Sequence, residues 1–238
     1  MKLSVILPIK GNGPFLEKAL TSISYQAIQP DEVLVINDGM GTPAKDILSA
    51  TDLPIRMIEG PKTGPAAARN LALAQATGEY VAFIDDDDVW PRQKLSLQLA
   101  RLEANPREQA SGGSIVWFKA WNEERDLPVE DQDVGTIFHV NLGAFVFRRA
   151  YLTEVGGLDS SLLFSEDVDL VLRMLDANTE FWVLNTPTLY YRRHNGSMTS
   201  ENSLEERRDF SKVLLRSIKR RPRQLIDRIA RLSRSPFD

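Results

Sequence analysis

Hydrophobic and polar positions alternate along the first half of the chain in a way that predicts strands and helices in turn. Residues 3–7 form a continuous apolar run, which is typical of a strand buried on both faces. Apolar residues then recur at helical spacing over residues 15–23. Further strands are expected at residues 33–36, 55–58 and 80–84, and further helices at residues 43–50 and 65–76. Alternating strands and helices predict a parallel sheet covered on both faces, so we expect an α/β fold.

The second half of the chain has a less regular pattern. Trp90-Pro91, followed by leucines at helical spacing, predicts a helix with proline in its first turn. Short strands are expected at residues 114–120, 136–140, 144–147, 181–184 and 188–192, and a helix at residues 167–176. The charged residues 123–133 predict a surface loop. Because no linker interrupts the pattern, we expect one α/β domain over residues 1–204 and a helical tail over residues 205–238.

The composition excludes several classes of protein. With 42% hydrophobic and 26% charged residues, the 238-residue chain is typical of a soluble globular protein. Cysteine is absent, which excludes a disulfide scaffold, a thiolate zinc site and a cysteine nucleophile. No apolar stretch reaches the roughly 18 residues that a membrane span needs, and residues 3–7 are too few for a signal peptide. We therefore expect a cytoplasmic protein.

The net charge of -4 conceals an uneven distribution. Residues 205–238 contain 11 Lys and Arg against 5 Asp and Glu, so the tail is basic and the preceding part is acidic. An acidic body is compatible with divalent-cation chemistry. For the tail we consider two alternatives: peripheral contact with an anionic membrane at its inner face, or packing of its apolar stripe on the domain or on a second subunit, as in a homodimer.

Polar clusters follow three of the predicted strands. They are Pro8-Ile9-Lys10, Asn37-Asp38-Gly39 and the run Asp85-Asp86-Asp87-Asp88. Since ligands bind at the carboxyl ends of strands in such sheets, we expect the clusters to converge on one crevice. Four consecutive aspartates repel one another unless a cation or a helix N-terminus offsets them. We assign Asp85 and Asp87 to a site for nucleotide phosphates and a cation, and Asp88 to capping the helix entered at Pro91.

Five segments together resemble family 2 glycosyltransferases of the GT-A fold. They include SVILPIKGNG, DEVLVINDG, GEYVAFIDDDDVW, SEDVDLVLRM and YYRRHNGS, and the resemblance covers roughly residues 3–197. It implies a Rossmann-like α/β sandwich, here with a helical C-terminal tail. It also implies an enzyme that transfers a sugar from a nucleotide-diphosphate sugar, with a UDP-sugar expected, to an acceptor hydroxyl with inversion. The QxxRW motif of processive synthases is missing, so we expect single addition in cell-surface polysaccharide or glycoconjugate synthesis.

The resemblance also implies roles for particular residues. Asp38 meets the base or ribose, and Pro8 lies beside the nucleotide. The triplet Asp85-Asp86-Asp87 matches the DxD motif, with Asp87 on Mn²⁺ or Mg²⁺ and its neighbours near the ribose. Arg69 is placed near the nucleotide; the alternative is an exposed helix arginine paired with a carboxylate. His194 is placed near the diphosphate or the metal.

The acid pair Glu166-Asp167 matches the family's ED motif. Inverting transfer needs a carboxylate that takes the proton of the attacking hydroxyl, and we assign Asp167 to this role with Glu166 in reserve. The alternative is that these carboxylates cap the predicted helix. Asp169 is assigned to a structural or acceptor-side role.

Other readings of the sequence stay open. Where the family often has Asp-Asp-Gly-Ser, the chain has Asn37-Asp38-Gly39-Met40, so the nucleotide is not specified. A nucleotidyltransferase shares the α/β core and acidic metal sites. However, residues 10–14 of this chain resemble the glycine-rich phosphate-binding loop of such enzymes only weakly. A noncatalytic module that uses the tail on membrane or nucleic acid is the other alternative, although the acidic body argues against nucleic acid. The acceptor is an unspecified glycan, lipid-linked or small molecule.

Overall fold

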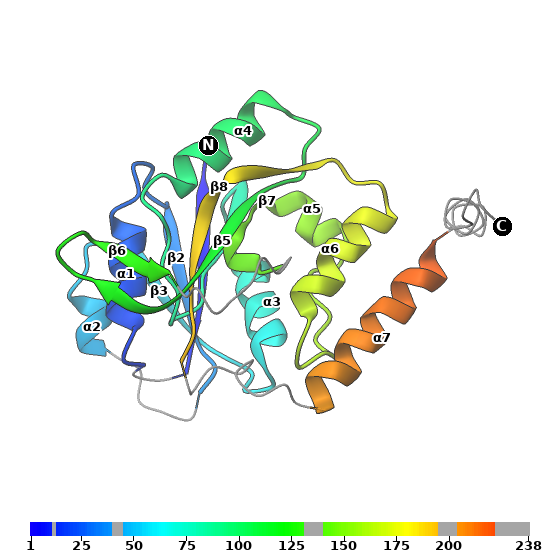
Figure 1. Ribbon diagram of the computed structural model, residues 1–238, viewed down its shortest axis with the longest axis horizontal. Helices are drawn as coiled ribbons and strands as arrows, with labels where there is room; N and C mark the ends of the chain where they lie inside the picture. The colour runs from blue at the N-terminus through cyan, green and yellow to red at the C-terminus, as the bar shows by residue number, and fades with distance from the viewer. Residues whose placement is uncertain (11–12, 40–44, 131–139, 195–203, 222–238) are drawn as a thin grey trace, which may run out of the picture.

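A mixed sheet forms the centre of the molecule (Figure 1). The structure, a computed structural model, describes residues 1–10, 13–39, 45–130, 140–194 and 204–221. The strands are β1 (Leu3–Ile9), β2 (Glu32–Asn37), β3 (Ile55–Glu59), β4 (Tyr80–Phe83), β5 (Ala110–Asn122), β6 (Leu127–Glu130), β7 (Val146–Arg148) and β8 (Phe181–Arg192). Their order is β3-β2-β1-β4-β7-β5-β6, and β8 pairs with β5.

The first four strands are parallel, as their sequence pattern predicts. β1 lies between β2 and β4, with Val5 opposite Val33 on one side and Ala82 on the other. Strand β7 then runs antiparallel between β4 and β5. The three strands β1, β2 and β4 are almost wholly buried because helices cover both faces, and this explains their continuous apolar sequences. The α/β expectation is confirmed.

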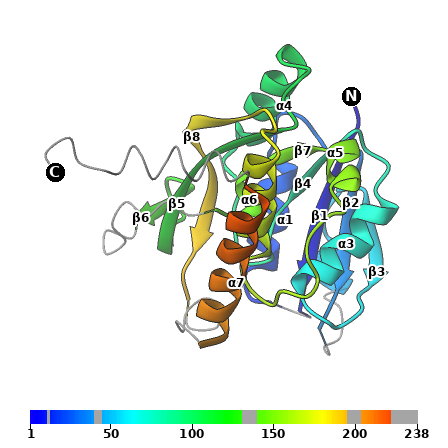
Figure 2. The same ribbon diagram turned by 90° about the vertical axis from the view of Figure 1, so that its right-hand side faces the viewer.

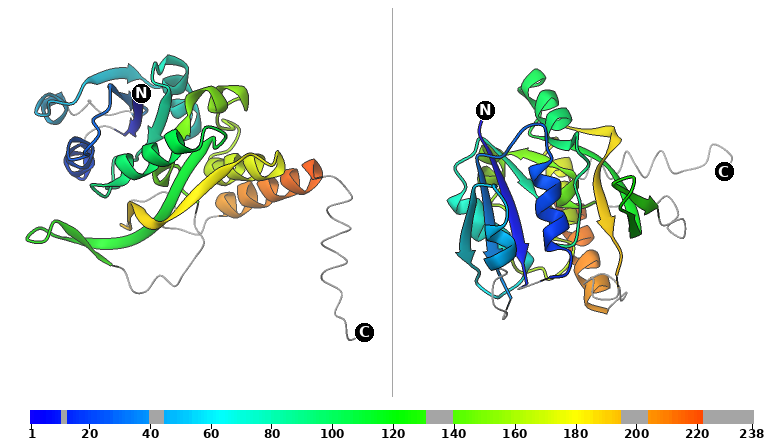
Figure 3. Two further views of the ribbon diagram at one scale, coloured as in Figure 1. Left: turned by 90° about the horizontal axis from the view of Figure 1, so that it is seen from above. Right: turned by 90° about the vertical axis from the view of Figure 1, so that its left-hand side faces the viewer.

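Helices flank the sheet on two sides (Figures 1 and 3). They are α1 (Leu16–Ser24), α2 (Lys45–Ser49), α3 (Pro65–Gln75), α4 (Lys94–Ala104), α5 (Arg149–Glu154), α6 (Glu166–Asp176) and α7 (Leu204–Arg220), with a 3-10 turn η1 (Leu142–Ala144). Gln26 joins α1 to α4 by donating to the Pro91 carbonyl and accepting from the Leu95 amide. On the other side, Asn70 of α3 bonds the backbone of Leu158, which follows α5. Within the described residues, no helix is long and apolar enough to cross a membrane.

The helix after the acidic run differs from the prediction. It begins at Lys94 rather than near Pro91, and its N-cap Gln93 makes no side-chain capping bond. Asp88 does not cap this helix: its Oδ1 accepts the Arg192 amide of β8 at 2.9 Å. The prediction was wrong because a capping pattern in the sequence cannot reveal a strand that approaches from 104 residues away.

The strands of the second half also depart from the expected pattern. Strand β5 begins at Ala110 and includes Gly112 and Gly113, residues that usually weaken strands. The Phe145 ring and the Thr188 side chain occupy the space above these glycines, where a Cβ would approach within 2.4 and 2.3 Å. Residues 127–130, expected in a loop, form β6, and Figure 3 shows the β5–β6 hairpin extending away from the helices. The two strands expected at 181–192 are one strand, β8, whose register shifts before Pro187. The strand expected at 136–140 lies mainly outside the described residues.

Helix α7, the described part of the tail, packs along α6 (Figure 2). Its Val213 is fully buried. The Asp176 carboxylate at the end of α6 accepts hydrogen bonds from Ser217, Arg220 and Arg221 at 2.8 to 3.0 Å. Of the two alternatives for the tail, packing on the domain therefore describes α7. Residues 222–238 lie outside the described part of the chain, and membrane contact stays a prediction.

Candidate active site

A pocket of about 540 Å³ opens at the carboxyl ends of the parallel strands. The three polar clusters predicted to converge do meet here. Pro8 and Lys10 follow β1, Asp38 follows β2, and Asp85, Asp86 and Asp87 follow β4, and all of them line the pocket. Arg69 of α3 and the pair Glu166-Asp167 at the start of α6 line it too. The site residues predicted from sequence are therefore brought together, and His194 adjoins them through Asp87.

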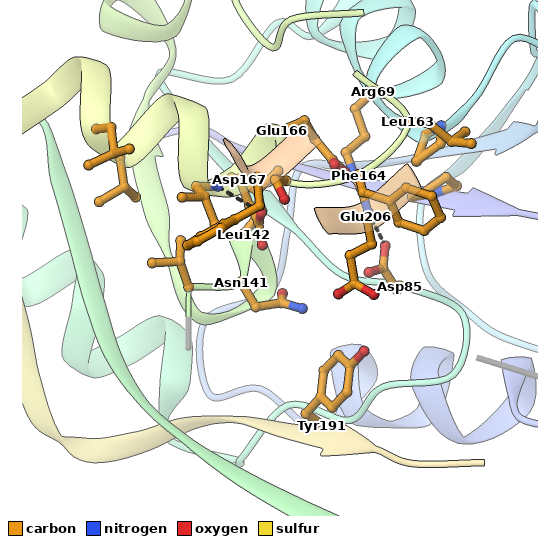
Figure 4. A pocket seen from close by; sticks show the side chains of 18 of the residues that line it. Arg69, Asp85, Asn141, Leu142, Leu163, Phe164, Glu166, Asp167, Tyr191 and Glu206 are labelled. Carbon is orange, nitrogen blue, oxygen red and sulfur yellow. Dashed lines mark hydrogen bonds and ion pairs between the residues drawn. The ribbon is translucent and has the colours of Figure 1, made fainter. Parts of the chain in front are cut away.

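Arg69 connects the two acidic motifs (Figure 4). Its guanidinium donates to Glu166 Oε1 at 2.6 Å and pairs with Asp85 through its other terminal nitrogen. The arginine side chain is only 7% exposed, so it is not the exposed helix arginine of the alternative interpretation. Although burial opposes the charge, Asp85 and Glu166 raise the pKa of Arg69. The arginine is thus a fixed cation between carboxylates that lie 81 residues apart in sequence.

The acidic run is offset in part by groups of the chain itself. Asp87 Oδ2 lies 2.9 Å from His194 Nε2, and the His194 ring contacts the Phe15 ring in a tilted arrangement with centroids 5.0 Å apart. Burial, with Asp87 and Asp85 beside it, raises the pKa of Asp86 to about 6. Burial, together with the negative charges of Asp87 and Asp85, raises the pKa of Asp88 well above its usual value. Charge that the four aspartates leave uncompensated favours a cation in this part of the pocket.

The metal-binding atoms at the acidic run fit a divalent cation that is also held by a bound diphosphate. No group of three or more His, Cys, Asp or Glu side chains in the described residues is placed to bind a metal. Asp87 and His194 supply two adjacent ligand atoms, an oxygen and a nitrogen. Since divalent ions in nucleotide sites usually take one or two carboxylates together with phosphate oxygens and waters, two protein ligands suffice when a diphosphate is bound.

Asp167 lines the pocket, and within the described residues it forms no ion pair. Its Oδ1 accepts the Val168 amide at 2.7 Å, whereas Glu166 is held by Arg69. Burial and the charge of Glu166 raise the pKa of Asp167 to about 8. Ser165, just before the pair, has a left-handed backbone with φ 64° and ψ 22°. Such strain in a residue other than glycine is frequent at functional sites.

Two further sequence predictions have a defined place. Asp38 Oδ1 accepts the Lys62 amide at 2.7 Å, which fixes the carboxylate at the edge of the pocket. Asp169, on the buried side of α6, accepts from Arg173 at 2.7 Å, in agreement with a structural role. His139 belongs to the strand pattern expected at residues 136–140, which indicates a structural role, and it lies outside the described residues.

Several residues that line the pocket were not predicted from the sequence. They include Leu142 of the η1 turn and its N-cap Asn141, Tyr191 of β8 and Glu206 of α7 (Figure 4). Apolar side chains of α6 and α7 complete the set: Val171, Leu172, Leu175, Phe210 and Leu214. Val171, Leu172 and Tyr191 lie within segments that resemble the family but have no assigned role there, and the others lie outside those segments. The only available signal was the helical spacing of the apolar residues, which indicates a buried face but not that this face borders a site.

Comparisons with known proteins identify the family of this site. Residues 4–154 match the family model "Glycosyl transferase family 2". The pre-mycofactocin glycosyltransferase of Mycobacterium tuberculosis is 30% identical over an alignment of 190 residues. The alignment covers 74% of this chain and 39% of that protein. The amylovoran biosynthesis glycosyltransferase AmsE of Erwinia amylovora is 27% identical over 76% of this chain and 71% of its own length. The chain thus spans about two fifths of the first of these relatives.

Solved structures show the same fold. S. aureus TarS 1-349 in complex with UDP-GlcNAc superposes with a TM-score of 0.68 at 20% identity, over 90% of this chain and 66% of that one. The mannosyltransferase PcManGT from Pyrobaculum calidifontis, in complex with GDP-Man and Mn²⁺, gives a TM-score of 0.67 at 19% identity, over 92% and 64%. Both neighbours are GT-A glycosyltransferases, and the chain has the GT-A fold.

Proposed function

Because the chain belongs to glycosyl transferase family 2, we propose that it transfers a sugar from a nucleotide-diphosphate sugar to an acceptor hydroxyl, in one displacement with inversion. The observation that carries this proposal is the link through Arg69. It joins Asp85 of the acidic run to Glu166, the neighbour of Asp167, so that a donor subsite and a candidate base share one pocket.

The donor occupies the acidic side of the pocket. Asp38 and Pro8 lie where the nucleoside enters, and Asp85 and Asp86 lie toward the ribose. Asp87 and His194 would hold Mn²⁺ or Mg²⁺ together with the diphosphate. Such an ion would supply positive charge to offset the charge that develops on the leaving diphosphate. Arg69 holds the Asp85 carboxylate in place through an ion pair, and so it shapes this subsite even though its terminal nitrogens are occupied.

Asp167 acts as the general base. As the acceptor oxygen bonds to the anomeric carbon, the bond from that carbon to the phosphate oxygen breaks and the hydroxyl proton passes to Asp167. A raised pKa suits this step, since a carboxylate that binds protons tightly is a stronger base. Glu166 is less suited because its Oε1 already accepts a hydrogen bond from Arg69 at 2.6 Å.

We propose a UDP-sugar as donor and a polysaccharide or glycoconjugate pathway as setting, with one sugar added per encounter. The UDP-GlcNAc in TarS and the pathway of AmsE support this choice. The GDP-Man in PcManGT makes GDP-sugars the alternative to be tested beside it.

The test follows the products of a panel of UDP- and GDP-sugars incubated with the full chain and Mn²⁺ or Mg²⁺. Water serves as a slow acceptor, so release of the nucleoside diphosphate is expected for one donor. Asp167→Asn should lower this release about 10²- to 10⁴-fold. Asp52→Asn, an exposed aspartate outside the pocket, is the matched control and should be unaffected. Pyrophosphate from a sugar phosphate and a nucleoside triphosphate would instead identify a nucleotidyltransferase.

A further inference from the structure

The pocket continues beyond Asp167 into an arm whose walls are apolar. Helix α6 contributes Asp167, Val171 and Leu175 at intervals of four residues, which places them in one row along about 12 Å of helix. Phe210 and Leu214 of α7, also four residues apart, line the same pocket. We call these four apolar side chains of α6 and α7 the apolar arm. The polarity of the pocket thus changes along its length, from aspartates at one end to hydrocarbon at the other.

The apolar arm is open, although its residues are hydrophobic. Leu175 is 48% exposed, Phe210 44% and Leu214 39%, whereas Val171 deeper in the arm is 5% exposed. An exposed apolar surface that leads out of a polar site is characteristic of a binding groove.

Fixed contacts hold the two helices that form the arm. Val213 of α7 is fully buried, and Asp176 bonds three side chains at the end of that helix. At the other end, Asp209 Oδ2 accepts the amides of Leu163 and Phe164 at 3.0 and 3.2 Å. Because these contacts tie α7 to the segment before α6, the arm is formed before any ligand arrives, which lowers the cost of binding.

We propose that the apolar arm binds the alkyl chain of a lipid-linked acceptor, whose hydroxyl-bearing end lies against Asp167. This inference rests on the proposed function and names its acceptor class. An amphiphilic acceptor fits the change from polar to apolar lining residues. Its polar end reaches Asp167, while its alkyl chain covers Val171, Leu175, Phe210 and Leu214. A wholly polar acceptor leaves that hydrocarbon in water.

The charge of α7 supports a lipid surface as the source of this acceptor. Residues 204–221 carry seven basic and three acidic side chains. Arg216, Arg220 and Arg221 pair with Asp159 and Asp176 of the domain. The other basic side chains include Arg208, Lys212 and Lys219, which form no ion pair within the described residues. An excess of cations beside an apolar groove is attracted to an anionic membrane, from which a lipid chain enters. A second protein copy also covers apolar surface, but it gives no reason for the arm to continue inward to the candidate base.

The test measures how strongly the full chain binds methyl, hexyl and octyl β-D-glucopyranoside, each below its micelle concentration, by titration calorimetry. We expect affinity to rise about twofold for each added methylene, less than the roughly fourfold of full burial because the arm is half open. Leu214→Asp and Leu175→Asp should abolish this dependence on chain length. Leu215→Asp, at a 59% exposed position on α7 that does not line the pocket, is the matched control and should keep it.

Two results would overturn the inference: equal affinity for methyl and octyl glucoside, or equal loss in Leu215→Asp and Leu214→Asp. A dimer in sedimentation velocity that Leu214→Asp dissociates, without alkyl-chain binding, would assign the arm to a second copy instead.

Binding of UDP and GDP with Mn²⁺ is measured on the same samples. If nucleotide binds and chain length has no effect, the acceptor class is wrong and the proposed function stands. If the chain binds and no nucleotide does, the proposed function is wrong.

Discussion

Arg69 shows how one buried side chain joins motifs that are distant in sequence. A lysine at this position reaches one carboxylate at a time, because it has a single ammonium group instead of a two-pronged guanidinium. We predict that Arg69→Lys lowers the free energy of unfolding by about 1–3 kcal/mol and weakens donor binding, because Asp85 or Glu166 is left without its partner.

Urea unfolding and nucleotide titration measure these two effects. Arg56→Lys is the control, since Arg56 is 44% exposed and its bond to Glu32 is 3.4 Å long. That change should alter stability by less than about 0.5 kcal/mol. Equal effects of the two substitutions would show that the link between the motifs has no special role.

The raised pKa of Asp167 has consequences for both activity and stability. Activity needs the ionised base, so the rate should rise with pH through about 8. Stability should change in the opposite direction. At pH values between about 4, the ordinary pKa of an aspartate, and about 8, the pKa of Asp167 in the folded protein, Asp167 is ionised in the unfolded chain but protonated in the folded one. Stability therefore falls with rising pH by at most about 1.4 kcal/mol per unit.

Urea unfolding of the wild type and of Asp167→Asn at pH 5 and pH 8 isolates this contribution. The difference between the two pH values should be smaller in the variant, since asparagine does not titrate. An unchanged difference would mean that Asp167 titrates near its ordinary pKa in the folded protein.

At the scale of elements, the η1 turn that borders the acceptor side of the pocket is fixed from beneath by α4. Gln98 donates to the carbonyls of Ala144 and Ser111 at 2.8 and 2.7 Å. Lys94 donates to Gln98 Oε1 at 2.7 Å and to the Phe145 carbonyl at 3.3 Å, and its burial lowers the pKa of its ammonium well below the usual value. The two side chains form a buried network under the turn that carries Asn141 and Leu142.

We predict that Gln98→Ala lowers the free energy of unfolding by about 2–4 kcal/mol, because it removes three buried hydrogen bonds: those to the Ala144 and Ser111 carbonyls and the one from the Lys94 ammonium. Chemical denaturation measures this. Gln93→Ala at the start of the same helix, where no capping bond is made, is the control and should cost much less. Equal costs would show that helix propensity, and not the network, sets the stability here.

The contact between α6 and α7 makes a separate prediction. Ser217, Arg220 and Arg221 lower the pKa of Asp176 even though burial opposes them. We expect Asp176→Ala to destabilise the protein by about 1–3 kcal/mol and to loosen α7 first. Hydrogen exchange of the α7 amides should accelerate more than that of β1. Glu205→Ala, at an exposed position on α7, is the control, and faster exchange in both variants alike would contradict the prediction.

At the scale of the whole molecule, the sequence predicts what depends on local pattern. The parallel half of the sheet could be predicted because buried strands read as apolar runs, and the convergence of Pro8, Asp38 and Asp85 follows from strand ends meeting at one edge. Contacts between distant segments could not be predicted. The pairing of Arg69 with Glu166 joins residues 97 positions apart, and no periodicity encodes it.

The second half of the chain illustrates the same limit. The proline of β6 and the glycines of β5 contradict strand propensity. Pairing with neighbouring strands and packing against Phe145 offset this. The basic face of α7 was visible in the sequence, but its partner Asp176 was not. The apolar wall of the pocket was missed for this reason, because it forms only where α6 meets α7.

If this pocket binds a nucleotide-sugar donor with a divalent cation, UDP or GDP should stabilise the protein only when a metal is present. A thermal-shift series with the two nucleotides tests this. Each is measured with Mn²⁺, with Mg²⁺ and with a chelator, for the wild type and for Asp87→Asn. We predict that one nucleotide, at about 100 times its Kd, raises Tm by roughly 5–10 °C only with metal. Asp87→Asn should lose most of this rise. No shift with either nucleotide at millimolar concentration, or the same shift in Asp87→Asn and with chelator, would contradict the account.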